Sequence, residues 1–493
     1  MTNGAGGSAA AGAVLLATIL ASGMAFMDGS VVTVALPAIR EGFGAGFAEG
    51  QWTANAYTLT LAAFTLLGGA AGDAFGLRRV FMLGTALFGV ASAFCGLAWS
   101  VEVLIAARAV QGIGGALMVP GSLALISAHY PPPVRGRAIG TWAAASAIAP
   151  AIGPVLGGFL VDHGSWRAIF LINLPLAVAV LAVTALRVPD GAARRDAPMD
   201  WTGGALAVIG LGLVAFGLTR LAEPGGGGVI DIAAAVAGFA VLVGFILYER
   251  RTAHPMMPLA LFADRQFAGV NLLTLLLYFA LSGALFFLPT ALIEAHRYPA
   301  ALAGSVFLPF VLVMGVLSRY GGGLADRLGP RPVLTVGPIV TGLAFIALAP
   351  AVQNGGFVTA IVPVMLLMGL GMGITVAPLS TAVMNAAPAS LGGAASGVNN
   401  AVARVAGLVA VASLGLAVGI GFSLALGGEA GPAADAVRAA GFGAAPATAD
   451  AAATLLRSRA TIAGFGAATV ICGVLAILAG LVGWLTVRPR AEG

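Results

Sequence analysis

One acidic side chain, Asp28, lies well inside a long apolar stretch of the sequence, and one basic side chain, Arg108, lies inside another. A charge at the centre of a membrane helix costs about 2.5–3.5 kcal/mol, so such groups usually face a cavity and often relay protons. A buried Arg needs an opposite charge, and Asp28 is the candidate partner, directly or through water. Burial favours the neutral acid and a nearby cation favours the carboxylate. We therefore expect Asp28, balanced between these two effects, to exchange a proton for a cationic or neutral substrate. The structural alternative is that both side chains only make hydrogen bonds within the fold.

A polar motif occurs twice, with its two aspartates 253 residues apart, about half the chain. The first copy is Gly69, Asp73, Gly76, Arg78 and Arg79, and the second is Gly322, Asp326, Arg327, Gly329 and Arg331. Glycine lets helix ends approach closely, and an aspartate can face a helix N-terminus and pair with an arginine. The motif predicts a gate that forms and breaks, or else a rigid tight turn. Its repetition at half-length indicates two homologous membrane halves, which is typical of transporters.

The elements that must position these residues are membrane helices. The chain is 59% hydrophobic and 9% charged, against roughly 25% charged residues in soluble domains. Apolar runs of about 20 residues can cross a bilayer, and in lipid they must be helices. We predict an all-α polytopic fold with fourteen spans, roughly 13–37, 50–72, 79–99, 102–127, 136–161, 167–187, 201–220, 229–248, 267–292, 300–324, 332–350, 357–382, 394–425 and 460–486.

The spacing of the repeat divides these spans into two six-helix bundles, 1–187 and 267–493, with an inserted transmembrane hairpin and its flanking loops at 188–266. Orientation follows from the arginines. With the N-terminus in the cytoplasm, the inner loops hold 15 arginines and the outer side holds 7. Both termini and both copies of the repeated motif are then cytoplasmic. The longest connector, 426–459, is expected to be a mobile segment or a short surface helix.

Six further phrases occur in a characteristic order: MDGSVVTVALP (27–37), QWTANAYTL (51–59), RAVQGIGGA (108–116), APAIGPVLGG (149–158), WRAIFLINLP (166–175) and ASGVNNAVARVAG (395–407). With them the chain resembles the fourteen-helix drug:proton antiporters of the major facilitator superfamily, of the quaternary-ammonium and multidrug exporter type. Ser30, Thr33 and Val405 depart from the usual Thr, Asn and Gln of that pattern. The resemblance covers nearly the whole length.

The resemblance implies export of small lipophilic compounds or drugs, cationic or neutral, in exchange for protons by alternating access. It implies that Arg108 takes part in proton transfer. It also implies that Gly153, Pro154, Gly157 and Gly158 form an antiporter motif that limits leak, although plain close packing predicts much the same sequence. Small-molecule substrate, protons and the lipid bilayer are the expected partners, with no nucleic acid. The expected state is a monomer in a bacterial inner membrane.

The substrate cavity should be apolar and aromatic with few polar anchors. Its candidate residues are Met24, Phe26, Asn55, Tyr57, Gln111, Trp142, Tyr278, Phe286, Phe287 and Met372. We expect no cofactor and no metal, because the four histidines stand at loop or span ends and no HExxH pair or P-loop is present. An enzyme is therefore disfavoured. A proton-coupled uptake symporter, or an exporter of one specific metabolite on the same fold, stays open because fold alone does not fix the function.

Overall fold

The computed structural model describes residues 3–189, 200–221, 227–253, 255, 257–387, 392–443 and 451–489, and within these ranges the secondary structure is helical throughout. The contacts divide the chain into two compact units. The first contains Met1–Ala38, Trp52–Ile209 and Val241–Met256, and the second contains Ile39–Gln51, Gly210–Ala240 and Met257–Gly493. Each unit is described by itself below.

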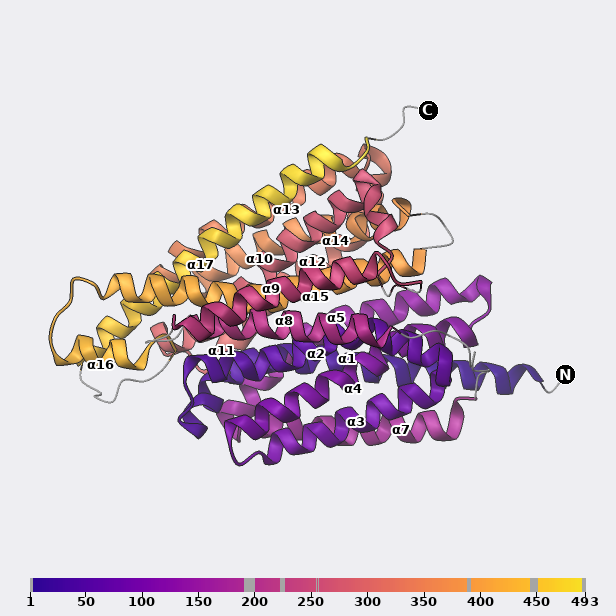
Figure 1. Ribbon diagram of the computed structural model, residues 1–493, viewed down its shortest axis with the longest axis horizontal. Helices are drawn as coiled ribbons and strands as arrows, with labels where there is room; N and C mark the ends of the chain where they lie inside the picture. The colour runs from indigo at the N-terminus through magenta and orange to yellow at the C-terminus, as the bar shows by residue number, and fades with distance from the viewer. Residues whose placement is uncertain are drawn as a thin grey trace. The chain divides into compact units, whose positions relative to one another are not determined.

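The first unit is built mainly from the helices α1 (Asn3–Phe43), α2 (Phe47–Phe75), α3 (Leu77–Leu97), α4 (Val101–His129), α5 (Pro132–His163), α6 (Ala168–Leu171) and α7 (Asn173–Arg187). Helix α3 packs against α4 and α7, and α1 contributes side chains to the same hydrophobic core (Figure 1). The tip of the α1–α2 hairpin belongs to the second unit, whereas the rest of both helices belongs to the first. Helices α8 (Trp201–Leu221) and α9 (Val229–Glu249) each contribute residues to both units.

The second unit contains α10 (Arg265–His296), α11 (Ala300–Ser305), α12 (Phe307–Leu328), α13 (Pro330–Asn354), α14 (Val362–Asn385), α15 (Gly392–Ala425), α16 (Pro432–Ala440) and α17 (Ala451–Thr486). A 3₁₀ turn, Leu259–Ala263, precedes α10, and a π-helical turn, Phe357–Ile361, precedes α14. The long connector at 426–459 therefore contains a short helix, α16, and its last residues already belong to α17.

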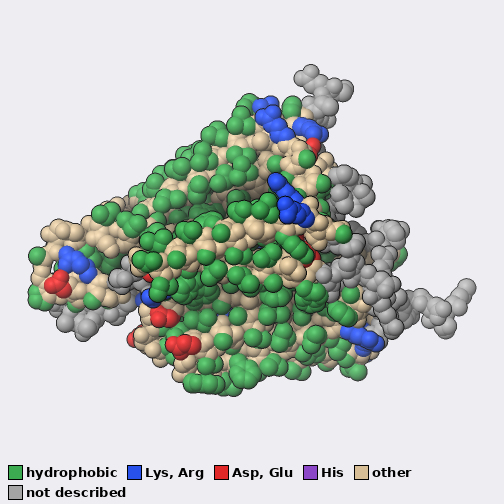
Figure 2. All heavy atoms as spheres, viewed as in Figure 1, with side chains coloured by type: hydrophobic (Ala, Val, Ile, Leu, Met, Phe, Trp, Pro, Cys, Tyr) green, Lys and Arg blue, Asp and Glu red, His purple; other side chains and the backbone are tan. Residues whose placement is uncertain are grey.

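Twelve helices in the described part of the chain are long and apolar enough to cross a membrane, and α8 and α9 are among them. Two further predicted spans, 50–72 and 136–161, coincide with α2 and α5, which are 29 and 32 residues long. Hydrophobic side chains cover most of the visible helix surfaces, and charged ones are few (Figure 2). Exposed apolar helix faces of this kind need lipid rather than water around them. The chain is thus a multi-pass membrane protein.

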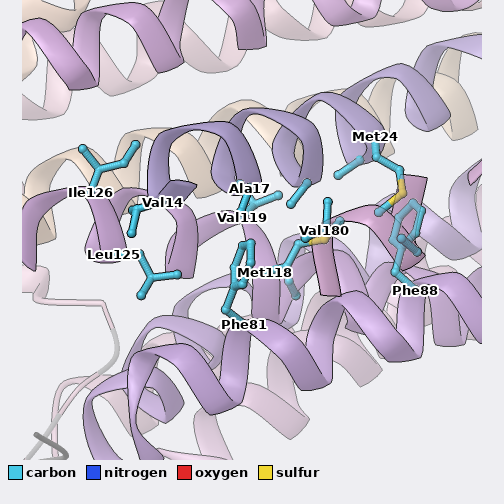
Figure 3. Packing of buried hydrophobic residues seen from close by; sticks show 14 of the residues in the cluster. Val14, Ala17, Met24, Phe81, Phe88, Met118, Val119, Leu125, Ile126 and Val180 are labelled. Atoms are coloured by element: carbon cyan, nitrogen blue, oxygen red, sulfur yellow. The ribbon is translucent and has the colours of Figure 1, made fainter. Parts of the chain in front are cut away.

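A hydrophobic core fixes the faces of the helices in the first unit. Side chains of α1, α3, α4 and α7 meet there, among them Met24, Phe88, Met118 and Val180 (Figure 3). Met24 lies one helical turn before Asp28, and Val32 lies one turn after it. Both neighbours are fully buried. The same packing that buries the apolar face of α1 therefore also takes Asp28 out of contact with solvent.

Candidate functional site

Asp28 and Arg108 form an ion pair in the interior of the first unit. Arg108 Nη1 donates to Asp28 Oδ2, and the side chains of Arg108 and Asp28 are 1% and 0% exposed. The residues come from α1 and α4 and are 80 positions apart in the chain. Removing two charges from water is costly, and their attraction repays that cost only where other hydrogen bonds satisfy both groups. The contact expected from the sequence is present, so the neighbouring donors and acceptors decide what the pair can do.

Arg108 has acceptors besides the carboxylate. Its Nε donates to the backbone oxygen of Thr53 at 3.0 Å, and its Nη1 donates to Gln111 Oε1 at 2.6 Å. Its guanidinium carbon lies 4.3 Å from the ring centroid of Tyr57 and 5.6 Å from that of Phe170. A cation over an aromatic face is stabilised further when it is desolvated. Arg108 is thus held by α2, α4 and α6 even without counting Asp28.

Asp28 receives two amide hydrogen bonds as well. Gln111 Nε2 and Asn173 Nδ2 both donate to its Oδ1, at 2.9 and 2.8 Å. The same two amide nitrogens donate to Ser92 Oγ, at 2.6 and 3.1 Å. Side chains from α1, α3, α4 and α7 therefore form one network around the carboxylate. Charge-assisted hydrogen bonds of this kind are stronger than neutral ones.

Ser92 and Asn173 are the members of this network that sequence reasoning missed. Asn173 falls within the phrase WRAIFLINLP, which contributes only to the family resemblance. A signal was available, because an amide inside an apolar run needs a polar partner, and Asp28 and Arg108 were the obvious ones. Ser92 offered a weaker signal, since a serine can satisfy itself by bonding to its own helix backbone.

Glycines let the neighbouring helices approach this network closely. A Cβ atom on Gly112 would lie 2.3 Å from the Tyr57 backbone oxygen, so α4 and α2 touch at that point. A Cβ atom on Gly153 of α5 would lie 2.2 Å from Ser30 Oγ and 2.8 Å from the Met27 backbone oxygen. Gly157, one turn later, faces Val31 in the same way. The glycines predicted as an antiporter motif therefore pack against the turn of α1 that carries Asp28.

Replacing Gly153 with alanine should displace that turn of α1. No real Cβ atom sits 2.8 Å from a backbone oxygen, so α1 and α5 must separate. We expect the unfolding free energy to fall by about 1–3 kcal/mol, as for other overpacked sites. The measurement is the apparent Tm of the purified protein together with its transport rate.

Gly23→Ala is the matched control for Gly153→Ala. A Cβ atom on Gly23 would meet the Cβ of Ala149 at 3.8 Å, an ordinary contact between the same two helices. Helix propensity alone makes this change neutral to slightly stabilising. Equal melting temperatures for the two variants would show that the close approach of α5 to α1 has no energetic consequence.

The two copies of the repeated motif have matching local geometry. Gly76 and Gly329 each precede a helix with positive φ angles of 99° and 85°, a conformation that glycine adopts without strain. Two residues later, Arg78 Nη2 donates to the Ala185 backbone oxygen at 2.7 Å, and Arg331 Nε donates to that of Trp484 at 2.6 Å. Each arginine thus binds carbonyls at the C-terminal end of a helix, α7 or α17, where a cation is favoured by the helix dipole.

The remaining members of the motif are only partly visible. The side chains of Asp73 and Asp326 lie outside the described residues. Arg79 and Arg327 are exposed, whereas Gly69 and Gly322 are half-buried. The positive φ angles of Gly76 and Gly329 agree with a tight turn, one of the two interpretations of the motif. The other interpretation, a gate, stays a prediction.

The predicted substrate residues are distributed over both units. In the first unit, Tyr57 and Gln111 join the Asp28 network, Asn55 and Met24 are buried, and Phe26 and Trp142 pack against the hydrophobic core. The indole nitrogen of Trp142 donates to Ser22 Oγ at 3.0 Å.

In the second unit, Phe286 and Phe287 stack edge to face with centroids 4.9 Å apart. Met372 is buried in α14, and Tyr278 is half-buried in α10. The two groups of residues belong to different units, so their role in binding substrate stays a prediction.

Related sequences agree with a transport function. The chain is 34% identical over 406 residues to the multidrug resistance protein Stp of Mycobacterium tuberculosis (strain CDC 1551 / Oshkosh), covering 81% of this chain and 74% of that protein. It is 33% identical over 405 residues to the tetracenomycin C resistance and export protein of Streptomyces glaucescens, covering 82% and 75%. It is 31% identical over 426 residues to the methylenomycin A resistance protein of Bacillus subtilis (strain 168), covering 85% and 91%.

Solved structures with the same fold are transporters too. A bacterial homologue of the human lysosomal transporter Spinster, in an inward-facing and occupied conformation, matches with a TM-score of 0.68 at 16% identity over 96% of each chain. The xylose transporter XylE from E. coli matches with a TM-score of 0.62 at 14% identity, covering 98% of this chain and 97% of that one. The family model described as the Major Facilitator Superfamily matches residues 18–411. This protein is therefore a membrane transporter rather than an enzyme, and it belongs to the Major Facilitator Superfamily.

Proposed function

We propose that the protein exports small lipophilic compounds, cationic or neutral, in exchange for protons, and that it works by alternating access. The observation that carries this proposal is the buried Asp28–Arg108 pair and its ring of hydrogen bonds. A carboxylate inside the membrane destabilises the protein, and the residues that carry such groups usually have a function. In this network it is the group that can take up and release a proton.

The network supports both protonation states of Asp28. When the carboxylate is neutralised, Arg108 retains the Thr53 carbonyl, Gln111 Oε1 and the Tyr57 ring, so its own charge stays stabilised. Asn173 can serve both states, because its amide offers a donor and an acceptor. Its Nδ2 donates to the carboxylate, and its Oδ1 is buried without a hydrogen-bond partner among the described residues. A rotation of that amide would present the oxygen to the O–H of a protonated Asp28.

The related proteins favour export over other kinds of transport. The three described above are named for multidrug resistance, for resistance to and export of tetracenomycin C, and for methylenomycin A resistance. The motif phrases of the drug:proton antiporters point the same way, including the type that exports quaternary ammonium compounds. The substrate range of this chain is therefore proposed to be broad and lipophilic.

The proposed architecture has fourteen spans in a bacterial inner membrane, with both termini in the cytoplasm. Residues 1–187 and 267–493 form the two halves, and 188–266 contribute the inserted hairpin, α8 and α9. Fourteen is the number obtained when α2 and α5 are added to the twelve helices that qualify by length and composition. The repeated motif would act as the inner gate, Gly153, Pro154, Gly157 and Gly158 would limit leak, and the protein would function as a monomer.

The ten predicted substrate residues are proposed to contact the cargo during transport. Tyr57 and Gln111 already contact the Asp28–Arg108 pair, so a substrate bound against them would lie next to the charge of Asp28. Methionine and aromatic side chains repack around varied ligands, which suits a broad substrate range.

Everted membrane vesicles test the direction of coupling. One proton moving down about 100 mV releases about 2.3 kcal/mol, and one pH unit adds about 1.4 kcal/mol, together enough for about a 500-fold gradient of a neutral substrate. Exchange of one proton for one ethidium, a lipophilic fluorescent cation, moves no net charge, so only the pH difference drives it. Acidifying the interior of everted vesicles by one pH unit should therefore concentrate ethidium about tenfold inside them, and an uncoupler should release it. Vesicles without the protein give the background. Acid-driven loss of dye from the vesicles would instead show a proton symporter.

A further inference from the structure

A second candidate site lies in the second unit, next to the C-terminal end of the short helix α16. Figure 1 shows α16 in the connection between α15 and α17. A cavity of about 490 Å³ lies there, bounded by the start of α2, the end of α8, the end of α15 and the segment from Arg438 to Phe442. Cavities that hold drug-sized ligands measure about 300–1,000 Å³. This cavity is therefore large enough for one such molecule.

The aromatic wall of the cavity is held in place by the backbone. Phe442 stands between Gly441 and Gly443, whose φ angles are 71° and 72°. Residues that carry a side chain rarely adopt such φ angles, so the two glycines allow the turn that positions Phe442. The Phe442 backbone oxygen accepts a hydrogen bond at 3.1 Å from Nη1 of Arg40, which is itself buried. Position 442 is therefore fixed by a turn and a buried cation rather than by ring packing alone.

Three phenylalanines, from α2, α15 and the segment after α16, line this cavity. The Phe442 ring meets the Phe47 ring edge to face at 5.5 Å and the Phe422 ring at 6.3 Å. Phe47 begins α2, and Phe422 lies near the end of α15. Edge-to-face clusters present both ring faces and ring edges, and aromatic ligands pair with either. Aliphatic side chains of α8 and α15 complete the lining.

The charged side chain in the lining, Arg438, already has hydrogen-bond acceptors within the protein. Among the described residues that border the cavity, Arg438 alone is charged. Its Nη1 donates to Asp435 Oδ1 at 2.8 Å, and its Nη2 donates to the backbone oxygens of Leu426, at 2.6 Å, and Glu429. An anion would have to compete with these acceptors, and a cation would meet no carboxylate among the described residues that border the cavity. An uncharged ligand therefore loses least on entering.

We propose that this cavity binds an uncharged aromatic lipophile of drug size, as a peripheral site for the exported compound, separate from the Asp28 network. The inference rests on the proposed export function for the source of the ligand. The binding itself does not need transport and can be measured on the purified protein. The site would give neutral aromatic compounds a place to bind that involves no titrating group.

A reporter cysteine tests the site without disturbing it. Ser423 borders the cavity and is exposed, and the two native cysteines, Cys95 and Cys472, are both buried. The Ser423→Cys variant should react with a water-soluble maleimide, and N-phenyl-1-naphthylamine should protect it. At about ten times the Kd, mass action predicts labelling about tenfold slower. Ala425→Cys is the control, since residue 425 is exposed on the same helix but does not border the cavity. Its labelling rate should not change.

A cavity-filling change gives a second, independent readout. Adding Leu416→Trp to the Ser423→Cys variant should remove the protection, because Leu416 lines the same cavity. Protection that persists in the filled variant, or equal slowing at residues 423 and 425, would overturn the proposal. The proposal would also be overturned if a lipid occupies the cavity. In that case the Ser423→Cys variant in phosphatidylglycerol nanodiscs would react slowly without the probe, and adding the probe would not slow the reaction further.

Protection of residue 423 without export in everted vesicles would refute the export proposal and leave the binding site standing. Export without protection would refute the binding site and leave the export proposal standing.

Discussion

Asp28→Asn is expected to reduce proton-driven transport in everted vesicles to the background of vesicles without the protein. Asparagine has nearly the shape of aspartate, and its oxygen can still accept from Gln111 and Asn173. It cannot take up or release a proton, so the coupling step is lost while insertion in the membrane is retained. The measurement is dye accumulation after acidification of the vesicle interior, at matched protein levels.

Asp162→Asn is the control for Asp28→Asn. Asp162 lies near the end of α5 and is exposed, so the same chemical change there alters no buried charge. We expect this variant to transport at the wild-type rate. If the Asp28→Asn protein accumulates dye with an unchanged response to pH, Asp28 is not the coupling carboxylate. Drug susceptibility of an efflux-deficient host carrying each variant gives the same comparison in cells.

The second large effect concerns the stability of the ion pair. Arg108→Gln leaves the Asp28 carboxylate buried without its cation, and removing one partner of a buried pair typically costs about 3–5 kcal/mol. The double variant Asp28→Asn, Arg108→Gln removes both charges and leaves amides that can bond to each other and to Gln111. We therefore expect the double variant to be more stable than Arg108→Gln alone and to remain inactive in transport. The measurement is the apparent Tm of each purified protein in the same detergent.

This double-mutant cycle separates structure from coupling. A strong interaction between the two substitutions is expected, because contacting residues in one network are not additive. Transport should stay lost when stability returns, since the proton-carrying group is absent in both cases. Additive losses of stability would show that Asp28 and Arg108 do not depend on each other. A double variant that recovers proton-driven transport would show that the pair has a structural role only.

The repeated motif shows how far one local pattern can be interpreted. Glycine before a helix start and an arginine two residues later were both visible in the sequence, and both copies have the same turn. The sequence did not reveal which backbone oxygen accepts the hydrogen bond from each arginine side chain. Arg78 reaches Ala185, 107 positions away, and Arg331 reaches Trp484, 153 positions away. Those partners depend on which helix packs beside the turn.

The sequence by itself determined the class of protein, the approximate bounds of most of its long helices and the two charges most in need of partners. The predicted spans 167–187 and 300–324 each contain two helices in the structure, α6 with α7 and α11 with α12. These follow from local physics, because a run of apolar residues must be helical in lipid and a charge within such a run must be compensated. The pairing of Asp28 with Arg108 could be expected for the same reason, since few other charges were available.

Only the tertiary structure decided the rest of the site. It brought Asn173 of α7 and Ser92 of α3 to the carboxylate of α1, laid Gly153 of α5 against the same turn, and placed Phe442 over a cavity at the end of α15. Helical periodicity says which residues share a face. Which faces meet is set by packing between segments far apart in the chain, and this information is not contained in any one of them.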